Sequence, residues 1–229
     1  MIHQHIFAAP RPGMTPEAFQ DYWLNTHAPN FASRIPQIKK YRIDTRLPFG
    51  PDTAPTWHGV AEIWLKDEAD QIASLQTPEF LQGARVDEPN WAAFWATLGL
   101  DCATETAGEP EPLPEGAVKL LVLHRRARGL TRDAFRDLHR LRIATPTAWA
   151  DGVLRHDVAF TRDALYVVGE PRFDAISHSW FADVAAAERF AASPAWRTLL
   201  PETADVIDPA QRFFMLTREH WVIGPAPRA

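Results

Sequence analysis

The sequence contains an internal repeat, and this repeat constrains the fold more than any other feature. When the chain of 229 residues is shifted by 116 positions, its two halves align without a gap over most of their length. The matched residues stand at helix starts, turns and core positions, where a shared fold restricts the residue type. They are Gly13, Thr15, Ala18, Phe19, Asp21, Thr45, Arg46, Trp64, Asp67 and Pro78, which fall on Gly129, Thr131, Ala134, Phe135, Asp137, Thr161, Arg162, Trp180, Asp183 and Pro194. We therefore predict two copies of one fold.

The first half has the pattern of a β-α-β-β-α-β unit. Strand-like runs bounded by turn residues occur at 2–9, 39–46, 58–65 and 99–105. Capping residues predict one helix over 15–28 and another that begins after Asp67, with a further cap-plus-proline start at Thr77. This order is that of the ferredoxin-like plait, so the predicted class is α+β.

The two predicted plaits are joined by the segment 106–116, T-A-G-E-P-E-P-L-P-E-G, which is rich in proline, glycine and acid and has no apolar periodicity. We therefore predict domains at 1–105 and 117–229 with a linker between them. A plait leaves one sheet face uncovered by its helices, and two such faces bury each other by packing together. The predicted architecture is a pseudo-twofold α+β barrel of two plaits packed sheet to sheet.

A histidine extends the apolar face of the first predicted helix. Thr15 is a good N-cap, and Phe19, Trp23 and His27 follow at intervals of four on one stripe. Pro29 predicts a break or kink just after His27. The imidazole should therefore lie in the last regular turn, on the buried side.

The repeat separates fold from function at this histidine. Phe135 and His139 take the places of Phe19 and Trp23, but Ile143 takes the place of His27. A histidine is therefore not required there by the fold, which favours a chemical role for His27.

Composition excludes several classes of partner. The net charge of −5, the pI near 6.0 and the absence of a basic run argue against nucleic acid. The N-terminus enters strand-like alternation without a leader pattern, and no apolar run approaches the roughly 20 residues of a membrane helix. The single cysteine, Cys102, excludes an internal disulfide and fits a reducing compartment. We expect a cytoplasmic protein that contacts neither nucleic acid nor membrane.

The first half resembles the EthD family of the dimeric α+β barrel superfamily. The resemblance rests on 13–29, the strand around Tyr41, the run A-E-I-W-L-K-D-E-A-D, T-P-E-F at Thr77 and V-D-E at 86–88. It extends to the second half only through the shared architecture. It implies a barrel normally made by two subunits, here by two halves of one chain, with a further homodimer left open. It also implies small organic substrates and cofactor-free chemistry, since relatives include polyketide cyclases, muconolactone isomerases and monooxygenases, and it matches His27 to the histidine of the family's H-x-P motif.

His27 is the first candidate for general acid and base catalysis, because imidazole titrates near neutral pH. The structural alternative is a core histidine bonded to a backbone carbonyl. Tyr41 could donate a phenolic hydrogen bond to a carbonyl or enolate, or could be an ordinary aromatic strand residue. Trp23 and Trp64 are predicted to wall the pocket.

The third strand carries an unexpected carboxylate. Alternation places His58, Glu62 and Trp64 on one face, where a buried acid is costly unless it is paired. The shift of 116 positions aligns Asp174 with His58 and His178 with Glu62, so each half has one acid and one imidazole at these positions. We predict that Glu62 pairs with His178 near the pseudo-twofold axis or, alternatively, that it orients the catalytic histidine or acts as a base.

Two further histidines, His3 and His5, share a face of the first strand, close to His58 and Glu62. These are the ligand types of a histidine-plus-carboxylate metal site, but the spacing is common by chance, and we predict no metal. Three histidines of the second half are interpreted as structural or exposed, namely His124, His139 and His156. The sequence has no glycine-rich phosphate loop and no G-x-S-x-G, CxxC or HExxH motif, so no cofactor is predicted.

These observations predict a cofactor-independent enzyme that acts by proton transfer on a small hydrophobic, aromatic or polyketide-like carbonyl compound. The reaction would be of the cyclase, isomerase, dehydratase or decarboxylase type. His27 would be the acid and base, Tyr41 and Glu62 would polarise or orient, and His58 would join Trp23 and Trp64 in binding. Asp174 and His178 are the second-half candidates. A cofactor-free monooxygenase, a non-catalytic module for hydrophobic ligands or assembly, and more remotely a haem protein remain the alternatives.

Overall fold

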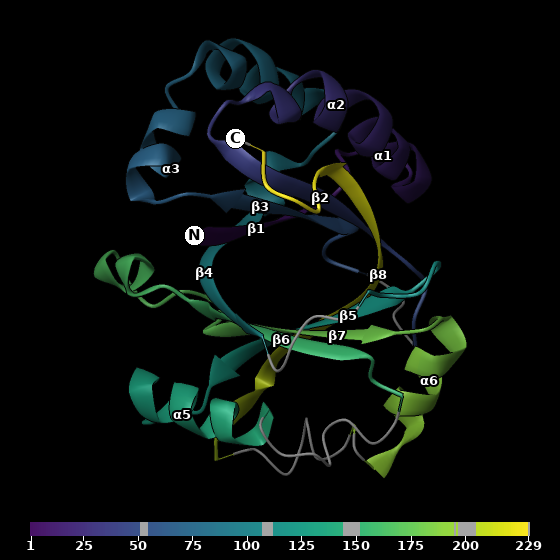
Figure 1. Cartoon of the computed structure of the whole chain (residues 1–229), viewed down its shortest axis with the longest axis vertical. Coiled ribbons are helices and arrows are strands. Elements are labelled where there is room, and N and C mark those ends of the chain that lie inside the picture. The colour runs from purple at the N-terminus through teal and green to yellow at the C-terminus, as the bar shows by residue number, and fades with distance from the viewer. Residues whose placement is uncertain (51–54, 107–111, 144–151, 195, 197–204, 229) are drawn as a thin grey trace. The chain divides into compact units, whose positions relative to one another are not determined.

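A computed structural model describes residues 1–50, 55–106, 112–143, 152–194, 196 and 205–228 of the chain (Figure 1). The α+β class is confirmed. The chain divides into two compact units. Unit 1 comprises Met1–Arg46, Asp52–Cys102 and Glu219–Ala229, and unit 2 comprises Leu47–Pro51 and Ala103–Arg218.

These units do not coincide with the two predicted domains. Strand β4 (Leu98–Thr106) begins in unit 1 and ends in unit 2, and strand β8 (Ile207–Ile223) runs from unit 2 into unit 1. The chain therefore crosses between units within strands. Residues 107–111 of the predicted linker lie outside the described residues. The packing of two plaits as a pseudo-twofold barrel stays a prediction.

Unit 1 contains the strands and helices expected for the first half of the sequence. Its elements are β1 (Ile2–Ala8), α1 (Pro16–Tyr22), η1 (Trp23–His27), α2 (Ala28–Asn30), η2 (Ala32–Arg34), β2 (Ile38–Arg46), β3 (Gly59–Leu65), α3 (Glu68–Ser74), η3 (Glu79–Ala84), α4 (Arg85–Asp87), η4 (Glu88–Asn90), η5 (Phe94–Ala96) and the start of β4. The strands are antiparallel in the order β4-β1-β3-β2. His3 is opposite Trp64, and Tyr41 is opposite Ile63.

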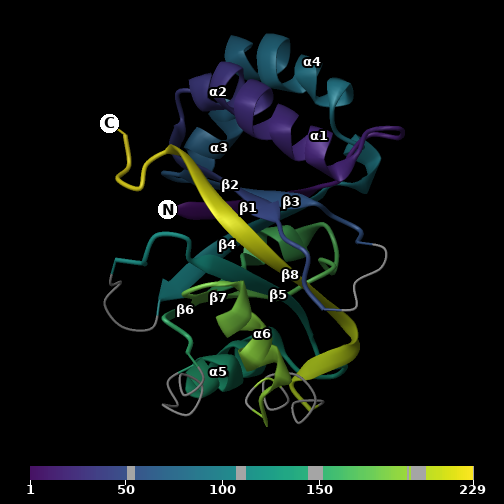
Figure 2. The ribbon, with the colours of Figure 1, turned by 90° about the vertical axis from the view of Figure 1, so that its right-hand side faces the viewer.

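The helices of unit 1 cover one face of this sheet, as Figures 1 and 2 show for α1, α2 and α3 over β1, β2 and β3. The core between them contains Phe19 and Trp23 from the helix layer and Tyr41, Ala61 and Ile63 from the strands. Because side chains alternate along a strand, residues 62 and 64 project from the other face of the sheet. This division into a helix face and an opposite face separates the candidate residues described below.

Unit 2 repeats the same topology. Its elements are the end of β4, β5 (Val118–Arg126), α5 (Arg132–Ile143), β6 (Arg155–Thr161), η7 (Asp163–Val167), β7 (Ala175–Phe181), α6 (Val184–Ala192) and most of β8. The antiparallel order is β8-β5-β7-β6. This order corresponds strand by strand to that of unit 1.

Equivalent capping contacts support the repeat at a shift of 116. The hydroxyl of Thr15 accepts from the N–H of Ala18, and that of Thr131 accepts from the N–H of Ala134. Just before each helix a glycine, Gly13 or Gly129, has a positive φ, at 85° and 86° respectively, which a residue with a Cβ rarely adopts.

The second strand of each repeat departs from that shift by one residue. Thr45 is opposite Gly59 in unit 1, whereas Phe160 is opposite Ala175 in unit 2. Thr161 therefore takes the structural place of Arg46, and the predicted match of Thr45 with Thr161 is wrong. A one-residue difference in a strand exchanges the two faces, which identity of residue type alone does not reveal.

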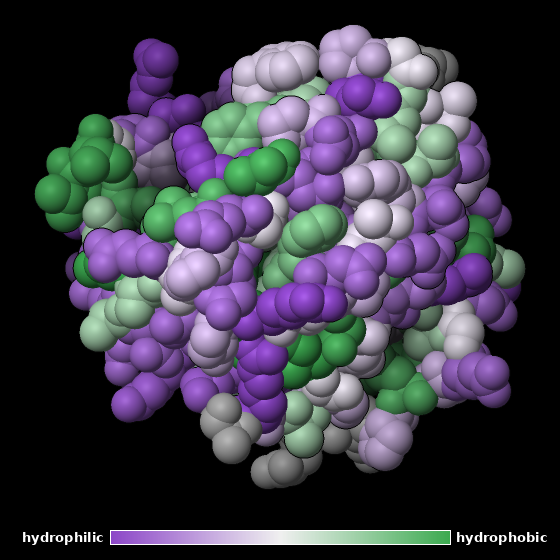
Figure 3. All heavy atoms as spheres, turned by 90° about the horizontal axis from the view of Figure 1, so that it is seen from above, coloured by the Kyte–Doolittle hydropathy of each residue, from purple (hydrophilic) through white to green (hydrophobic). Residues whose placement is uncertain are grey.

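The described helices include none that is long and apolar enough to cross a membrane. Figure 3 shows hydrophobic patches standing between hydrophilic side chains on the face seen from above. A cytoplasmic location stays a prediction.

Candidate functional site

His27 ends a helical segment that changes its hydrogen-bonding pattern just before the histidine. After α1, the five residues of η1 form a π-helical turn, and the N–H of Ala28 bonds to the carbonyl of Trp23. Such turns are rare and often occur at functional sites, because the extra residue redirects the side chains that follow. The predicted helix over 15–28 is thus present, with a π-turn inside it. It does not break after His27 but continues as α2 to Asn30, because Pro29 lies in the first turn of α2, where a proline is tolerated. Phe19, Trp23 and His27 are all buried as expected.

The imidazole of His27 forms a buried pair with Asp87 of α4. Nδ1 of His27 lies 2.8 Å from Oδ2 of Asp87. The other carboxylate oxygen, Oδ1, accepts from the hydroxyl of Tyr22 at 2.8 Å and from the amide of Asn90 at 3.0 Å. Because both oxygens are engaged, the carboxylate is fixed and in turn fixes the orientation of the ring.

Burial and the hydrogen bonds of the pair shift the pKa of each group in opposite directions. Burial lowers the pKa of His27, and Asp87 opposes this shift without reversing it. Burial raises the pKa of Asp87, but hydrogen bonds from Asn90, His27 and Tyr22 outweigh it, so the net pKa lies below the ordinary value. At neutral pH the stable state is therefore a neutral imidazole beside a carboxylate.

A neutral imidazole that donates from Nδ1 to a carboxylate has its lone pair on Nε2. Among the described residues, Nε2 of His27 has no hydrogen-bond partner within the chain. This is the arrangement of a general base held in one tautomer by an acid. His27 is 6% exposed, so the ring is nearly but not completely enclosed.

Aromatic rings surround the imidazole. The ring of Trp91 lies 4.7 Å from that of His27 and 4.8 Å from that of Trp23, and Phe31 is 6.1 Å from the histidine. Trp23 thus packs on Trp91, which packs on His27, and its predicted place in the wall of a pocket stays a prediction. The surroundings of the imidazole are therefore largely aromatic.

Tyr41 is on the helix face of β2 but belongs to the core. The residue is 1% exposed, and its side chain hydrogen-bonds with Trp23, whose indole can only donate. Burial raises the pKa of Tyr41, and the bond from Trp23 only partly opposes this rise. The predicted polarising role therefore has no geometric support among the described contacts.

Glu62 and Trp64 lie on the other face of the sheet from His27. Oε2 of Glu62 is 2.8 Å from Nε2 of His3 and 2.5 Å from Nη2 of Arg42. The alternative in which Glu62 orients His27 is therefore wrong, because Asp87 performs that task and a β-sheet separates the two groups.

The other two predicted binding residues of unit 1, Trp64 and His58, lie on different sides of the sheet. Trp64 stacks on His3 with the ring centres 4.1 Å apart. His58 precedes β3, and its ring lies 6.4 Å from that of Phe19 in the helix-face core. The expectation that alternation would extend from Glu62 back to His58 is wrong, since the strand begins only at Gly59.

The two second-half candidates have different surroundings in unit 2. Asp174 accepts from the backbone and guanidinium of Arg126 and from the hydroxyl of Tyr166. His178 is buried on β7, with its ring 5.9 Å from that of Trp180. The predicted pairing of Glu62 with His178 would join the two units and stays a prediction.

The other three histidines of unit 2 bond to serines. His124 and His139 both contact Oγ of Ser177, at 2.9 and 3.3 Å, and His156 contacts Oγ of Ser179 at 2.8 Å. The contacts agree with the structural interpretation of these three residues. His124 and His139 are buried, and His156 is partly buried.

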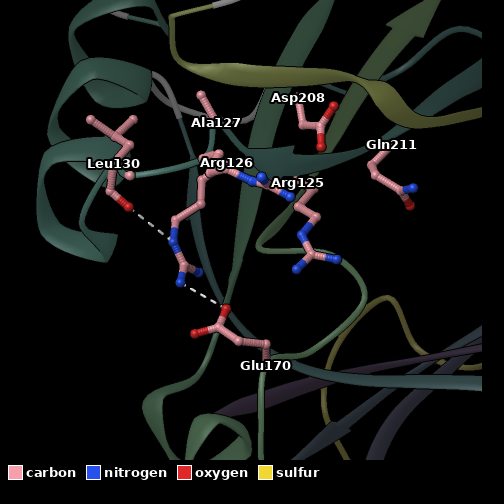
Figure 4. A pocket seen from close by; sticks show the side chains of 9 residues that line it. Arg125, Arg126, Ala127, Leu130, Glu170, Asp208 and Gln211 are labelled. Carbon is pink, nitrogen blue, oxygen red and sulfur yellow. Dashed lines mark hydrogen bonds and ion pairs between the residues drawn. The ribbon is translucent and has the colours of Figure 1, made fainter.

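A cavity of about 500 Å³ occurs in unit 2, and His27 is not among its lining residues (Figure 4). Figure 4 shows Arg126 reaching from one wall to the carbonyl of Leu130 and to Glu170, with Arg125 and Asp208 nearby. Its lining is largely charged and includes the ion pair of Arg126 with Glu170, and no predicted site residue contributes to it. We do not assign the chemistry to this cavity, because it lacks a titratable group suited to proton transfer near neutral pH.

Sequence reasoning missed the partners of His27. Asp87 ends α4, Asn90 ends η4, and Tyr22 is the last residue of α1, next to Trp23. A signal was present in the V-D-E run at 86–88, where the short acid follows an apolar residue, but nothing local showed which group it would meet.

Comparison with known proteins identifies the domain and the fold. The EthD domain family matches residues 11–94, which confirms the resemblance for this segment. A search of curated proteins gave no match. Among solved structures, an anthrone oxidase-like protein has 12% identity and a TM-score of 0.63, covering 100% of this chain and 95% of its own.

Two other solved structures have the same fold. A proposed monooxygenase of Fusobacterium nucleatum has 8% identity and a TM-score of 0.58, with 99% of this chain and 95% of its own covered. Another, from Lactobacillus acidophilus, has 12% identity and a TM-score of 0.56, with 100% and 99% covered. At such low identity these likenesses establish the fold over the whole chain and nothing of its chemistry.

Proposed function

Residues 11–94 carry an EthD domain, and from this premise we propose that the protein is an enzyme that transfers protons at a small aromatic or polyketide-like carbonyl compound. The observation that carries the proposal is the buried contact of 2.8 Å between Nδ1 of His27 and Oδ2 of Asp87. The proposed step uses only groups of this chain.

In this proposal, Nε2 of His27 takes a proton from carbon next to the substrate carbonyl. The imidazolium that forms is stabilised by Asp87, which stays ionised because Tyr22 and Asn90 bond to it. The same nitrogen then returns the proton at another position, or to a leaving oxygen. In isomerisation the proton returns to another carbon of the enolate. In cyclisation the enolate carbon forms a bond to a second carbonyl carbon of the substrate, and the proton goes to the alkoxide that results. In dehydration the carbon–oxygen bond next to the enolate breaks, and the proton leaves with the hydroxide as water.

The aromatic surroundings support a planar substrate. Trp91 and Phe31 flank the imidazole and would exclude water from the carbanion or enolate. Tyr41 and Glu62 are not part of this reaction, because the first is in the core and the second is on the other sheet face.

A second candidate is a cofactor-free monooxygenase, favoured by the names of the structural neighbours, which include an anthrone oxidase-like protein. The first step would be the same removal of a proton by His27. The carbanion would then give two electrons to O₂ and form a carbon-bound peroxide. Loss of the second hydrogen from the same carbon would break the O–O bond, so that one oxygen atom stays in the product as a carbonyl and the other leaves as water. Oxygen uptake therefore separates the two candidates.

Anthrone is a suitable probe, since it is an aromatic ketone with an acidic CH₂ group. In D₂O without oxygen, the native protein should catalyse exchange of this hydrogen for deuterium, measured by NMR. His27→Ala should lower the rate by about 10²–10⁴-fold, the usual contribution of a general base.

His124→Gln is the matched control, since His124 is also a buried histidine but bonds to Ser177 and not to a carboxylate. It should exchange at the native rate. Equal exchange in native protein and His27→Ala, with both folded, would refute the role of His27. Binding of anthrone without exchange would point instead to the non-catalytic module.

A further inference from the structure

A second group of metal-binding side chains lies in unit 1, on the sheet face away from His27. One ring nitrogen of His3, one ring nitrogen of His5 and one carboxylate oxygen of Glu62 all lie within 4.8 Å of one another. His3 and His5 are two residues apart on β1, and Glu62 is opposite His5 on the neighbouring strand β3. The register of the sheet therefore places all three on one face.

The spacing of these atoms is close to that of a coordination sphere. Nε2 of His3 is 2.8 Å and Nε2 of His5 is 4.0 Å from Oε2 of Glu62. Two ligands bound about 2.0–2.2 Å from one ion, at right or tetrahedral angles, are about 2.8–3.6 Å apart. The first distance already fits, and the second requires a movement of about half an ångström.

We propose that His3, His5 and Glu62 bind one divalent transition-metal ion. Two imidazoles and one carboxylate suit zinc, iron or cobalt, whereas magnesium and calcium prefer oxygen ligands. The three residues are at most 4% exposed, so the ion would be shielded from bulk water. A metal site goes beyond the proposed function and replaces the earlier prediction that the protein binds no metal.

Metal binding changes the hydrogen bonding of His3. The 2.8 Å contact with Glu62 is a hydrogen bond when Nε2 of His3 carries the hydrogen. An ion takes the place of that hydrogen, so the proton moves to Nδ1 or leaves to solvent.

Arg42 also contacts Glu62, but it has further acidic partners. Its Nη1 lies 2.8 Å from Glu219, and its Nε lies 3.2 Å from Asp44. The guanidinium therefore keeps two carboxylates when Glu62 turns toward an ion. Loss of its contact with Glu62 is the electrostatic cost of metal binding in this site.

The repeat predicts that unit 2 has no equivalent site. Lys119 and Leu121 take the places of His3 and His5, and His178 takes that of Glu62. An ammonium group and an isobutyl side chain cannot replace two imidazole ligands. The expected stoichiometry is thus one ion per chain.

The test uses the full chain without a histidine tag, titrated with Co²⁺ and followed by visible absorbance. We expect one Co²⁺ per chain, displaced by Zn²⁺ and not by Mg²⁺. His5→Gln and Glu62→Gln should each weaken binding by more than the roughly 10–100-fold that loss of an outer-shell partner costs. Because His3 stacks on Trp64, the paramagnetic ion should also quench the fluorescence of this ring, and Trp64→Phe should remove that part of the signal.

His124→Gln is the control, because it alters a buried strand histidine outside the cluster and should bind Co²⁺ like native protein. If Glu62→Gln fails to fold, His5→Gln decides, with Zn²⁺ raising the melting temperature of native protein but not of this variant. No uptake by native protein, or equal affinity in His5→Gln, would overturn the proposal. His27→Ala should still bind Co²⁺. Failure of the metal site is therefore distinguishable from failure of the proton-transfer role proposed for His27.

Discussion

Nδ1 of His27 lies 2.8 Å from Oδ2 of Asp87 across 60 positions of sequence, and both groups are buried. A histidine that served only the fold would not need so well fixed a carboxylate, since a backbone carbonyl satisfies one ring nitrogen equally well. Tyr22 and Asn90 bond to the same carboxylate, so the ring of His27 has one preferred orientation.

Asp87→Asn tests this relationship by removing charge at nearly constant shape. Asp87 raises the pKa of His27 against the effect of burial, so its loss should lower that pKa further. The acid limb of the rate of anthrone exchange should therefore move to lower pH, and the maximal rate should fall because the imidazolium loses its counter-charge. An unchanged limb and rate would contradict a positioning role for Asp87.

His156→Gln tests the contribution of a buried neutral histidine to stability against pH. Burial lowers the pKa of His156 to about 4, compared with about 6.5 in the unfolded chain. Between these values the unfolded chain binds a proton that the folded chain does not, so stability falls as the pH falls. The effect is absent above about pH 6.5 and complete below about pH 4.

Urea unfolding of native protein and His156→Gln at the two ends of this range should show the difference. The variant should lose about 2–3 kcal/mol less stability on acidification, because glutamine has no proton to gain. Its amide can still bond to Ser179. Parallel stability curves for the two proteins would contradict the expectation.

Gly59→Ala tests a close approach between β3 and its neighbours. A Cβ at Gly59 would lie 2.9 Å from the carbonyl oxygen of Asp44 and 3.0 Å from the ring of Trp23. The variant should be destabilised by about 1–3 kcal/mol, as is usual for overpacking. Gly99→Ala is the matched strand control, with no atom within 4 Å of its Cβ. Equal melting temperatures for both variants would refute the close approach.

Tyr41→Phe distinguishes a core role from a catalytic one. Removing the hydroxyl leaves the indole N–H of Trp23 without this acceptor, which should cost about 1–3 kcal/mol of stability. The rate of anthrone exchange should stay at the native value in folded protein. A slower rate at native stability would instead support the role predicted from sequence.

The sequence by itself determined the repeating α+β topology and most of the element boundaries. These depend on local rules, namely capping at Thr15 and Thr131, strand alternation, and glycines that supply a positive φ. It also placed His27 on a buried helix face. Local rules were insufficient at the start of β3 and in the second strand of the repeat, where a one-residue difference changed which face a side chain occupies.

Only the tertiary structure decided which groups meet. His27 meets Asp87 rather than Glu62, because Asp87 belongs to the helix layer and Glu62 projects from the other side of the sheet. His3 meets Glu62 because the register of β1 against β3 brings together residues 59 positions apart. Alternation can assign a side chain to a face, but the partner on that face depends on strand pairing and helix packing, which are long-range properties of the folded chain.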